Sequence, residues 1–249
     1  MVSSRSATSV ALNPLHGKPG RAAQPAFMLM PSLLSAPFER LGPAIEELQK
    51  AGAHVFHYDV MDGHFVPNLT IGPVLIESLQ KSGVTCEFDV HLMVTNPEIQ
   101  MKWFNVDLVR SVTIHHEVSR NIKRDMGWIR EHGKKAGLAL NPPTEIREVE
   151  ANLEHVDQVL VMSVYPGFAG QPFLHESLAK IEALVALRAK YDYHYTIQVD
   201  GGINPDTIQA VIDAGVDEVV SGSAIFSQSD PQKAYHDLCN RTPNSPAKD

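Results

Sequence analysis

A regular alternation of short apolar runs and amphipathic segments constrains the fold of this chain more than any other feature. From Phe27 onward, strand-length runs rich in β-branched and aromatic residues alternate with segments of helical period. The expected strands are Met28–Leu33, His54–Val60, Thr85–His91, Leu108–His115, Gly137–Asn141, Gln158–Ser163, Tyr195–Asp200 and Glu218–Ser221. The expected helices include Pro43–Gln49, Pro73–Gln80, Ile122–Glu131, Leu178–Lys190, Pro205–Asp213 and Pro231–Leu238.

Eight βα units in a chain of 249 residues indicate an α/β protein with a closed parallel sheet, a single (β/α)8 TIM barrel. The alternative is a doubly wound open sheet, which would require a Gly-rich turn after the first strand. The run Pro31–Ser35 is not such a turn. In a TIM barrel the chemistry takes place at the carboxyl ends of the strands, so polar residues there are the candidates for a site.

Local signals mark several helix ends. Asn204 and Asp230 are each followed by proline, a pattern typical of a capping residue before the first helical position. Gly52, Gly133 and Gly215 stand where expected helices should end.

The two ends of the chain differ from its centre, and we place the barrel domain at residues 27–242. Residues 1–26 are rich in Ser, Ala, Pro and Gly, and they contain basic but no acidic side chains. This composition favours a disordered N-terminal extension, with an organelle transit peptide as the alternative. Residues 243–249 are expected to form a disordered tail. Two cysteines and no secretory signal indicate a cytoplasmic protein.

The formal net charge of −8 argues against a nucleic-acid partner, because such binding depends on clustered lysine and arginine. No apolar run approaches the ~20 residues that a membrane-spanning helix needs, so no membrane partner is expected. An anionic substrate would have to be held by local dipoles, since bulk electrostatic attraction is absent.

Histidine and aspartate side chains stand where three expected strands end. His57 and Asp59 close the second strand, His91 closes the third and Asp200 closes the seventh. The period of two in a strand points His57 and Asp59 to one face and Tyr58 outward, toward the helices. Two imidazoles and two carboxylates suit one divalent cation: Zn, Fe, Mn or Co. The alternative is that the histidines pack internally and the aspartates cap helices.

A cation between two carboxylates suits proton transfer at a carbon next to a carbonyl group. The cation acts as a Lewis acid on the carbonyl, and one aspartate removes the proton from the adjacent carbon. A second aspartate on the opposite face returns a proton there, which inverts that carbon. Asp59 and Asp200 come from strands on opposite sides of the barrel, so they could flank a substrate.

Gly-rich loops after the sixth, seventh and eighth expected strands are typical of an anion site. Glycine lets backbone N–H groups approach an anion, and the loops after the last two strands are the usual phosphate site of TIM barrels. The residues expected there are Gly167, Phe168, Ala169, Gly170, Gly201, Gly202, Gly222 and Ser223.

Two further groups near strand ends each allow two interpretations. Met61, Met93 and Met162 could form an apolar lining that excludes water from the site, or they could pack in the core. The run His115–Glu117 offers a second ligand cluster, but neighbouring residues of a strand point to opposite sides, which argues against it.

Longer motifs around these residues resemble the ribulose-phosphate 3-epimerase family over about residues 28 to 240. The matching motifs are Pro31–Ser35, His57–Asn68, Asp89–Val94, Met162–Ser163, Pro166–Phe168, Val199–Gly202 and Val220–Ala224. The resemblance implies a (β/α)8 barrel that uses one divalent metal cation. The implied activity interconverts D-ribulose 5-phosphate and D-xylulose 5-phosphate through a 2,3-enediolate.

Residue by residue, the resemblance implies metal ligation by His57, Asp59, His91 and Asp200. Asp59 would be the proton acceptor and Asp200 the proton donor, with the roles exchanged in the reverse direction. Ser32 and His91 would contact the substrate, and the Gly-rich loops would hold its phosphate. The implied partner is a small sugar phosphate, and we expect a homo-oligomer.

The chain departs from the family pattern at several positions outside the expected ligands. Pro37 stands where the family usually has an acidic residue, Tyr165 where it has Asn or Glu, and Ala169 where it commonly has glycine. Arg110 is unusual within a strand. The run Gly167–Phe173 also resembles allulose-6-phosphate 3-epimerases, so a hexulose phosphate is the alternative substrate.

Other functions on the same fold would need different residues. A Schiff-base aldolase needs a lysine at a strand end, where none is expected. The phosphate-sugar decarboxylases carry an Asp-x-Lys-x-x-Asp array, and Met61 stands at its lysine position after Asp59. A non-catalytic phosphosugar-binding barrel is the alternative of a different class, and it would tolerate Asp59→Asn and Asp200→Asn.

Overall fold

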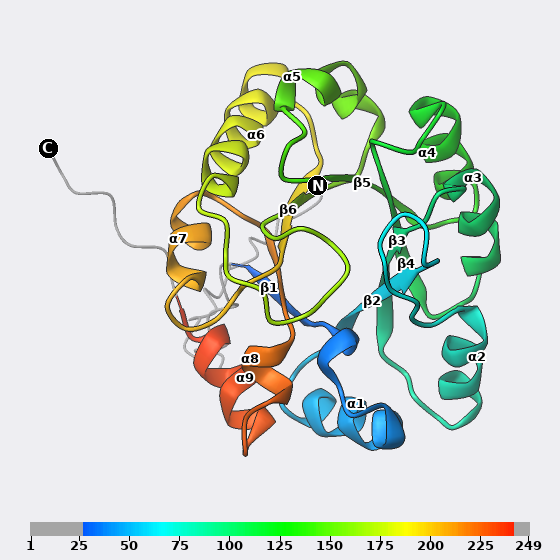
Figure 1. Cartoon of the computed structure of the whole chain (residues 1–249), viewed down its shortest axis with the longest axis vertical. Helices are drawn as coiled ribbons and strands as arrows, with labels where there is room; N and C mark the ends of the chain where they lie inside the picture. The colour runs from blue at the N-terminus through cyan, green and yellow to red at the C-terminus, as the bar shows by residue number, and fades with distance from the viewer. Residues whose placement is uncertain (1–26, 242–249) are drawn as a thin grey trace, which may run out of the picture.

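The computed structural model describes residues 27–241, which form a ring of parallel strands surrounded by helices (Figure 1). The predicted TIM barrel is therefore confirmed. Its strands are β1 (Met28–Pro31), β2 (Val55–Met61), β3 (Glu87–Met93), β4 (Val109–His115), β5 (Lys135–Leu140), β6 (Gln158–Met162), β7 (Thr196–Asp200) and β8 (Glu218–Ser221). The predictions for residues 1–26 and 243–249, and the predicted domain end at residue 242, lie outside the described residues.

Each strand pairs with its neighbour in parallel, in the order β1-β8-β7-β6-β5-β4-β3-β2. A single parallel bridge between Ser32 and His57 joins the two ends of this order. In the β2–β3 register His57 lies opposite Asp89 and Asp59 lies opposite His91. His57 therefore takes part both in the bridge that closes the barrel and in the pairing between β2 and β3.

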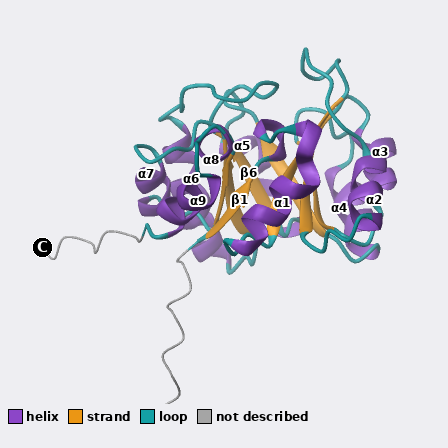
Figure 2. Cartoon of the chain, turned by 90° about the horizontal axis from the view of Figure 1, so that it is seen from below, coloured by secondary structure: helices purple, strands orange, loops and turns teal. Residues whose placement is uncertain are grey.

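Residues 27–241 form nine α-helices, and most of the expected helices are present within a few residues. They are α1 (Leu41–Lys50), α2 (Pro73–Lys81), α3 (Pro97–Gln100), α4 (Ile122–Glu131), α5 (Ile146–Val149), α6 (Ser177–Tyr191), α7 (Ile208–Asp213), α8 (Ser223–Phe226) and α9 (Pro231–Cys239). The single-turn helices α3, α5 and α8 were not among those expected, because four residues are too few to show a helical period. Turned by 90°, the barrel carries long loops at one end (Figure 2).

The capping signals are right at one of the two predicted positions. Asp230 accepts a hydrogen bond from the N–H of Lys233, and α9 begins with Pro231 as expected. The prediction that a helix begins at Pro205 is wrong, since α7 begins at Ile208. The Asn204 side chain accepts hydrogen bonds from the N–H groups of Asp206 and Thr207, which closes a separate turn before the helix. Gly52, Gly133 and Gly215 have the positive φ typical of the residue after a helix.

The outer face of the barrel packs on the helices and forms the large apolar core. Tyr58 is buried on this face, as predicted, and its hydroxyl donates to the carbonyl of Gly72 at 2.8 Å. The inner face holds small apolar clusters and a buried polar layer. No helix among residues 27–241 is long and apolar enough to cross a membrane.

Arg110, unusual for a strand residue, reaches a buried acid at the amino end of the barrel. Its Nη2 lies 3.2 Å from Oε1 of Glu218, whose side chain is 4% exposed. Burial and the charge of Asp89 raise the pKa of Glu218 from 4.5 to about 6, although Arg110 and Lys135 oppose the shift. The ionised form of Glu218 therefore costs stability.

This shift predicts a pH-dependent effect of Glu218→Gln. A carboxyl pKa that is higher in the folded chain makes ionisation unfavourable to folding above about pH 6, and the cost disappears below the ordinary value. A shift of this size corresponds to about 2 kcal/mol. We expect the free energy of unfolding of the variant, relative to wild type, to rise by about 2 kcal/mol as the pH is raised from 4 to 7. Urea unfolding at each pH measures it. A stability difference that is the same at both pH values would contradict the assignment.

Candidate functional site

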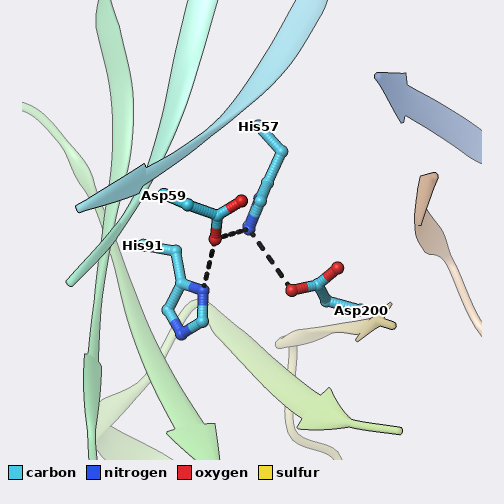
Figure 3. Close-up of side chains that lie close together, drawn as sticks. All are labelled: His57, Asp59, His91 and Asp200. Atoms are coloured by element: carbon cyan, nitrogen blue, oxygen red, sulfur yellow. Dashed lines mark hydrogen bonds and ion pairs between the residues drawn. The ribbon is translucent and has the colours of Figure 1, made fainter. Parts of the chain in front are cut away.

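Four side chains predicted as ligands converge at the carboxyl end of the barrel (Figure 3). His57 and Asp59 come from β2, His91 from β3 and Asp200 from the end of β7. One potential ligand atom of each lies within 4.8 Å of those of the others. In the described part of the chain, no other group of three or more His, Cys, Asp and Glu side chains meets this condition.

The geometry of this cluster suits a divalent cation. Nε2 of His57 is buried and meets no well-oriented hydrogen-bond partner among the described residues. It lies 3.2 Å from Oδ1 of Asp59 and 3.8 Å from Oδ2 of Asp200. A buried nitrogen without a partner is costly unless a ligand completes its coordination. Imidazole and carboxylate donors suit the divalent cations expected from the sequence, so the residues present fit such an ion.

The two aspartates of the cluster have pKa values shifted in opposite directions. Burial acts to raise the pKa of Asp59, but the charges and hydrogen bonds of His57 and His91 outweigh it and hold that pKa below its usual range. Burial, with the charges of Asp59 and Asp89, raises the pKa of Asp200 to about 7 against the opposing effect of His57. A pair of carboxyl groups whose pKa values differ in this way suits one base and one acid.

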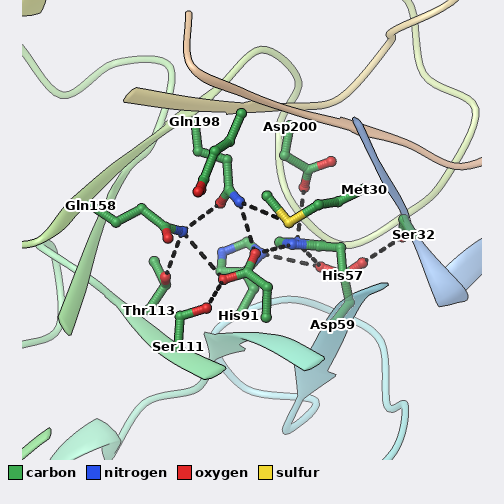
Figure 4. A network of polar contacts seen from close by, with 12 residues as sticks. Met30, Ser32, His57, Asp59, His91, Ser111, Thr113, Gln158, Gln198 and Asp200 are labelled. Atoms are coloured by element: carbon green, nitrogen blue, oxygen red, sulfur yellow. Dashed lines mark hydrogen bonds and ion pairs between the residues drawn. The ribbon is translucent and has the colours of Figure 1, made fainter. Parts of the chain in front are cut away.

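A polar layer lies directly below the cluster, inside the barrel (Figure 4). Asp89 accepts at Oδ2 from Gln198 at 2.8 Å, and at Oδ1 from Ser111 at 2.5 Å. Nδ1 of His57 lies 2.7 Å from the same Oδ2. Gln158 donates to Gln198 at 2.9 Å and lies 3.3 Å from Oδ1 of Asp89. The buried carboxylate of Asp89 is thus held by several donors from different strands.

A cavity opens above the cluster, and Asp59 and Asp200 lie at its wall. Ser32 also lines it and donates from Oγ to Oδ2 of Asp59 at 2.9 Å. The side chains of Met61, Met93 and Met162 contribute an apolar part of the lining. Of the two interpretations of these methionines, the one that places them in the lining of the site therefore agrees with the geometry.

The residues predicted to hold a substrate lie around this cavity, with one exception. His91 is fully buried below it and does not line the wall. The others are Ser32, Gly167, Phe168, Ala169, Gly170, Gly201, Gly202, Gly222 and Ser223. Their contact with a substrate stays a prediction.

His115 and Glu117 do not form a second cluster, because His115 contacts the first one. Nε2 of His115 lies 2.8 Å from Nε2 of His91, and its Nδ1 lies 3.1 Å from Oε2 of Glu117. Phe65 packs on the ring of His115 with centroids 4.6 Å apart. Sequence reasoning weighed His115 only as a member of a separate ligand cluster, and it assigned no role to Asp89. The period of two would have placed Asp89 on the inner face with His91, but nothing in the pattern showed their partners.

Comparison with known proteins identifies related sequences over most of the chain. The model of the Ribulose-phosphate 3 epimerase family matches residues 28–226. The ribulose-phosphate 3-epimerase of Serratia marcescens is 42% identical over 207 residues, which cover 83% of this chain and 99% of the relative. That of Bacillus subtilis is 41% identical over 84% of this chain and 96% of the relative.

Solved structures with lower sequence identity share the fold. KGPDC from Streptococcus mutans, in complex with D-R5P, has a TM-score of 0.65 at 14% identity and covers 86% of this chain and 95% of its own. 3-Hexulose-6-phosphate synthase from Salmonella typhimurium has a TM-score of 0.62 at 16% identity and covers 86% and 97%. At these identities the likeness extends to the barrel alone.

Proposed function

The chain belongs to the ribulose-phosphate 3-epimerase family of isomerases, and we propose that it interconverts D-ribulose 5-phosphate and D-xylulose 5-phosphate. The observation that carries this proposal is that Asp59 and Asp200, from β2 and β7, both line one cavity, with the two histidines beside them. Epimerisation needs a proton removed from one face of a carbon and another delivered to the opposite face. Two carboxyl groups from strands across the barrel suit that task.

We propose that His57, Asp59, His91 and Asp200 hold one divalent cation. When bound, the cation supplies Lewis-acid stabilisation of the substrate carbonyl, which makes the neighbouring C3–H more acidic. Binding needs both imidazoles neutral, each with a lone pair facing the cation. The buried Nε2 of His57 supports this assignment, because it faces two carboxylates and yet makes no hydrogen bond of good geometry.

In the direction from ribulose to xylulose, Asp59 removes the C3 proton and Asp200 delivers one to the opposite face. The roles are exchanged in the reverse direction, and a 2,3-enediolate lies between the two transfers. Ser32 donates to Asp59 and so orients the other oxygen of this carboxylate. The methionines of the lining exclude water, which favours return of a proton by a carboxyl group rather than by solvent.

The loops after β6, β7 and β8 are proposed to hold the phosphate. Gly167, Gly170, Gly201 and Gly202 all have positive φ, a conformation that lets the chain turn tightly beside the cavity. Since the net charge of −8 gives no general attraction for an anion, backbone dipoles of these loops would supply it. The cytoplasmic location and the homo-oligomer stay predictions.

Solvent isotope exchange tests the reaction directly. We expect deuterium from D2O at C3 of the pentulose 5-phosphate during turnover, and we expect its loss after treatment with a chelator and its recovery on adding a divalent cation. Mass spectrometry or proton NMR would follow both. The absence of cation-dependent C3 exchange with both a pentulose and a hexulose phosphate would contradict the proposal.

The preferred sugar is decided by a comparison of kcat/KM for D-ribulose 5-phosphate and allulose 6-phosphate. We expect the pentulose phosphate to be the better substrate. A higher kcat/KM for the hexulose phosphate would replace the proposed substrate while leaving the reaction type in place.

A further inference from the structure

Each proposed histidine ligand has a hydrogen-bond partner behind its ring, but the partner faces Nδ1 in His57 and Nε2 in His91. Nδ1 of His57 faces Asp89, which leaves Nε2 directed at Asp59 and Asp200. Nε2 of His91 faces His115, which leaves Nδ1 directed at Asp59 at 3.1 Å. A neutral imidazole carries its proton on one nitrogen and a lone pair on the other, so the partner behind each ring decides which nitrogen can bind a cation.

Asp89 determines which ring nitrogen of His57 carries the proton. Ser111, Gln158 and Gln198 point donor groups at its two oxygens, so this carboxylate acts as an acceptor. Its Oδ2, 2.7 Å from Nδ1 of His57, therefore requires the proton on Nδ1. The lone pair of His57 then lies on Nε2, toward the cluster.

Glu117 determines the protonated nitrogen of His91 through the ring of His115, which lies between them. Its Oε1 accepts from the N–H of Asn141 at 2.9 Å and from the hydroxyl of Thr144, and its Oε2 faces Nδ1 of His115. The proton of a neutral His115 is then on Nδ1, and its Nε2 is an acceptor. His91 must place its own proton on Nε2 to donate across 2.8 Å, which leaves the lone pair on Nδ1.

We propose that Asp89, and Glu117 acting through His115, are positioning residues that select Nε2 of His57 and Nδ1 of His91 as the ligating atoms. The inference rests on the metal site of the proposed function. We call the two hydrogen-bonded chains behind the ligands relays: Asp89–His57 is the first and Glu117–His115–His91 the second. Their outer residues come from different parts of the barrel, with Asp89 on β3, His115 at the end of β4 and Glu117 in the loop that follows. His115 is fully buried under Phe65, so water does not compete for the middle of its relay.

Glu117→Gln should reverse the second relay without removing it. The two donors at Oε1 require the amide oxygen there, which places the amide N–H group opposite Nδ1 of His115. His115 must then accept at Nδ1 and carry its proton on Nε2. His91 is forced to move its proton to Nδ1, into the position that a cation would need.

The first measurement uses the wild-type protein loaded with Zn²⁺. Two-bond ¹H–¹⁵N correlation spectra of the imidazoles report which nitrogen carries the proton. We expect protonated Nδ1 in His57, protonated Nε2 in His91 and protonated Nδ1 in His115. A proton on Nε2 of His115 would overturn the relay through Glu117, and a proton-free Nδ1 in His57 would overturn the role of Asp89.

The second measurement is the Zn²⁺ Kd, obtained by competition with a chromophoric chelator. We expect Glu117→Gln to raise the Kd about 10–100-fold, as is typical for loss of an outer hydrogen-bond partner of a ligand. Thr144→Val is the matched control, because it removes one bond to Oε1 but leaves the carboxylate facing His115, and its Kd should equal that of wild type. Thermal unfolding of the metal-free variants checks that each is folded.

The outcomes separate this inference from the proposed function. A wild-type protein that binds no stoichiometric divalent cation would overturn the metal site, and the relay with it. Normal binding by wild type together with an unchanged Kd in Glu117→Gln would overturn the relay alone. A raised Kd in the glutamine variant with the reversed tautomer of His115 in its spectrum would support it.

Discussion

Asp200→Asn should lower kcat for epimerisation by about 10²–10⁴-fold, while C3 exchange with solvent survives in ribulose 5-phosphate. Asparagine keeps an oxygen donor but cannot deliver a proton to the second face of the carbon. Asp59 remains able to remove the C3 proton, and each exchange of its carboxyl proton with solvent before return to the same face places deuterium at C3. The ratio of deuterium incorporation to epimerisation, followed by NMR in D2O, should therefore rise above that of wild type.

Asp59→Asn should show the mirror-image result. Its kcat should fall by the same order, and the surviving exchange should be in xylulose 5-phosphate, whose C3 proton faces Asp200. Both aspartates are expected ligands, so the bound cation must be measured in each variant and restored where it is lost. Asp107→Asn, an exposed aspartate in the turn before β4, serves as the control and should keep the wild-type kcat.

Two results would contradict the assignment of the two carboxyl groups. Near wild-type epimerisation by either variant with a full complement of cation would mean that the replaced carboxyl group does not transfer the proton. Survival of exchange in the same epimer for both variants would mean that a single group serves both faces.

Much of the barrel was predictable because its signals are local. Each strand is an apolar run bounded by turn residues, and five of the helices extend over nine or more residues, enough to show the 3.6-residue period. The period of two also placed His57 and Asp59 together on the inner face, so the ligand cluster followed once the strands closed into a ring. These inferences needed no knowledge of distant contacts.

The parts that were missed depend on register between strands. Asp89 meets His57 because the two lie opposite each other in the β2–β3 pairing, and Gln198 reaches Asp89 across the barrel. His115 was judged by its immediate neighbours in sequence, whereas its contact with His91 comes from the adjacent strand. Likewise, the start of α7 was set by an asparagine turn that competes with a helical first turn.

Gly202→Ala should destabilise the protein and weaken phosphate binding together. Gly202 has φ of +65°, and an added Cβ would lie 2.6 Å from Cα and 2.7 Å from N of Phe173. The left-handed conformation costs an L-residue about 1–2 kcal/mol, and the backbone contact adds overpacking strain of about 1–3 kcal/mol. We expect a loss of about 2–5 kcal/mol in the free energy of unfolding, measured by urea denaturation.

Gly133→Ala separates the cost of the left-handed conformation from the cost of the backbone contact. Gly133 has φ of +73° at the end of α4, but an added Cβ would meet nothing within 4 Å. We expect it to cost only the conformational part, about 1–2 kcal/mol, with KM unchanged. Gly202→Ala should also raise KM, because relief of the contact moves the loop of Phe173 away from the loop of Gly202 beside the cavity. Equal destabilisation by the two variants, or an unchanged KM in Gly202→Ala, would show that this contact does not shape the phosphate site.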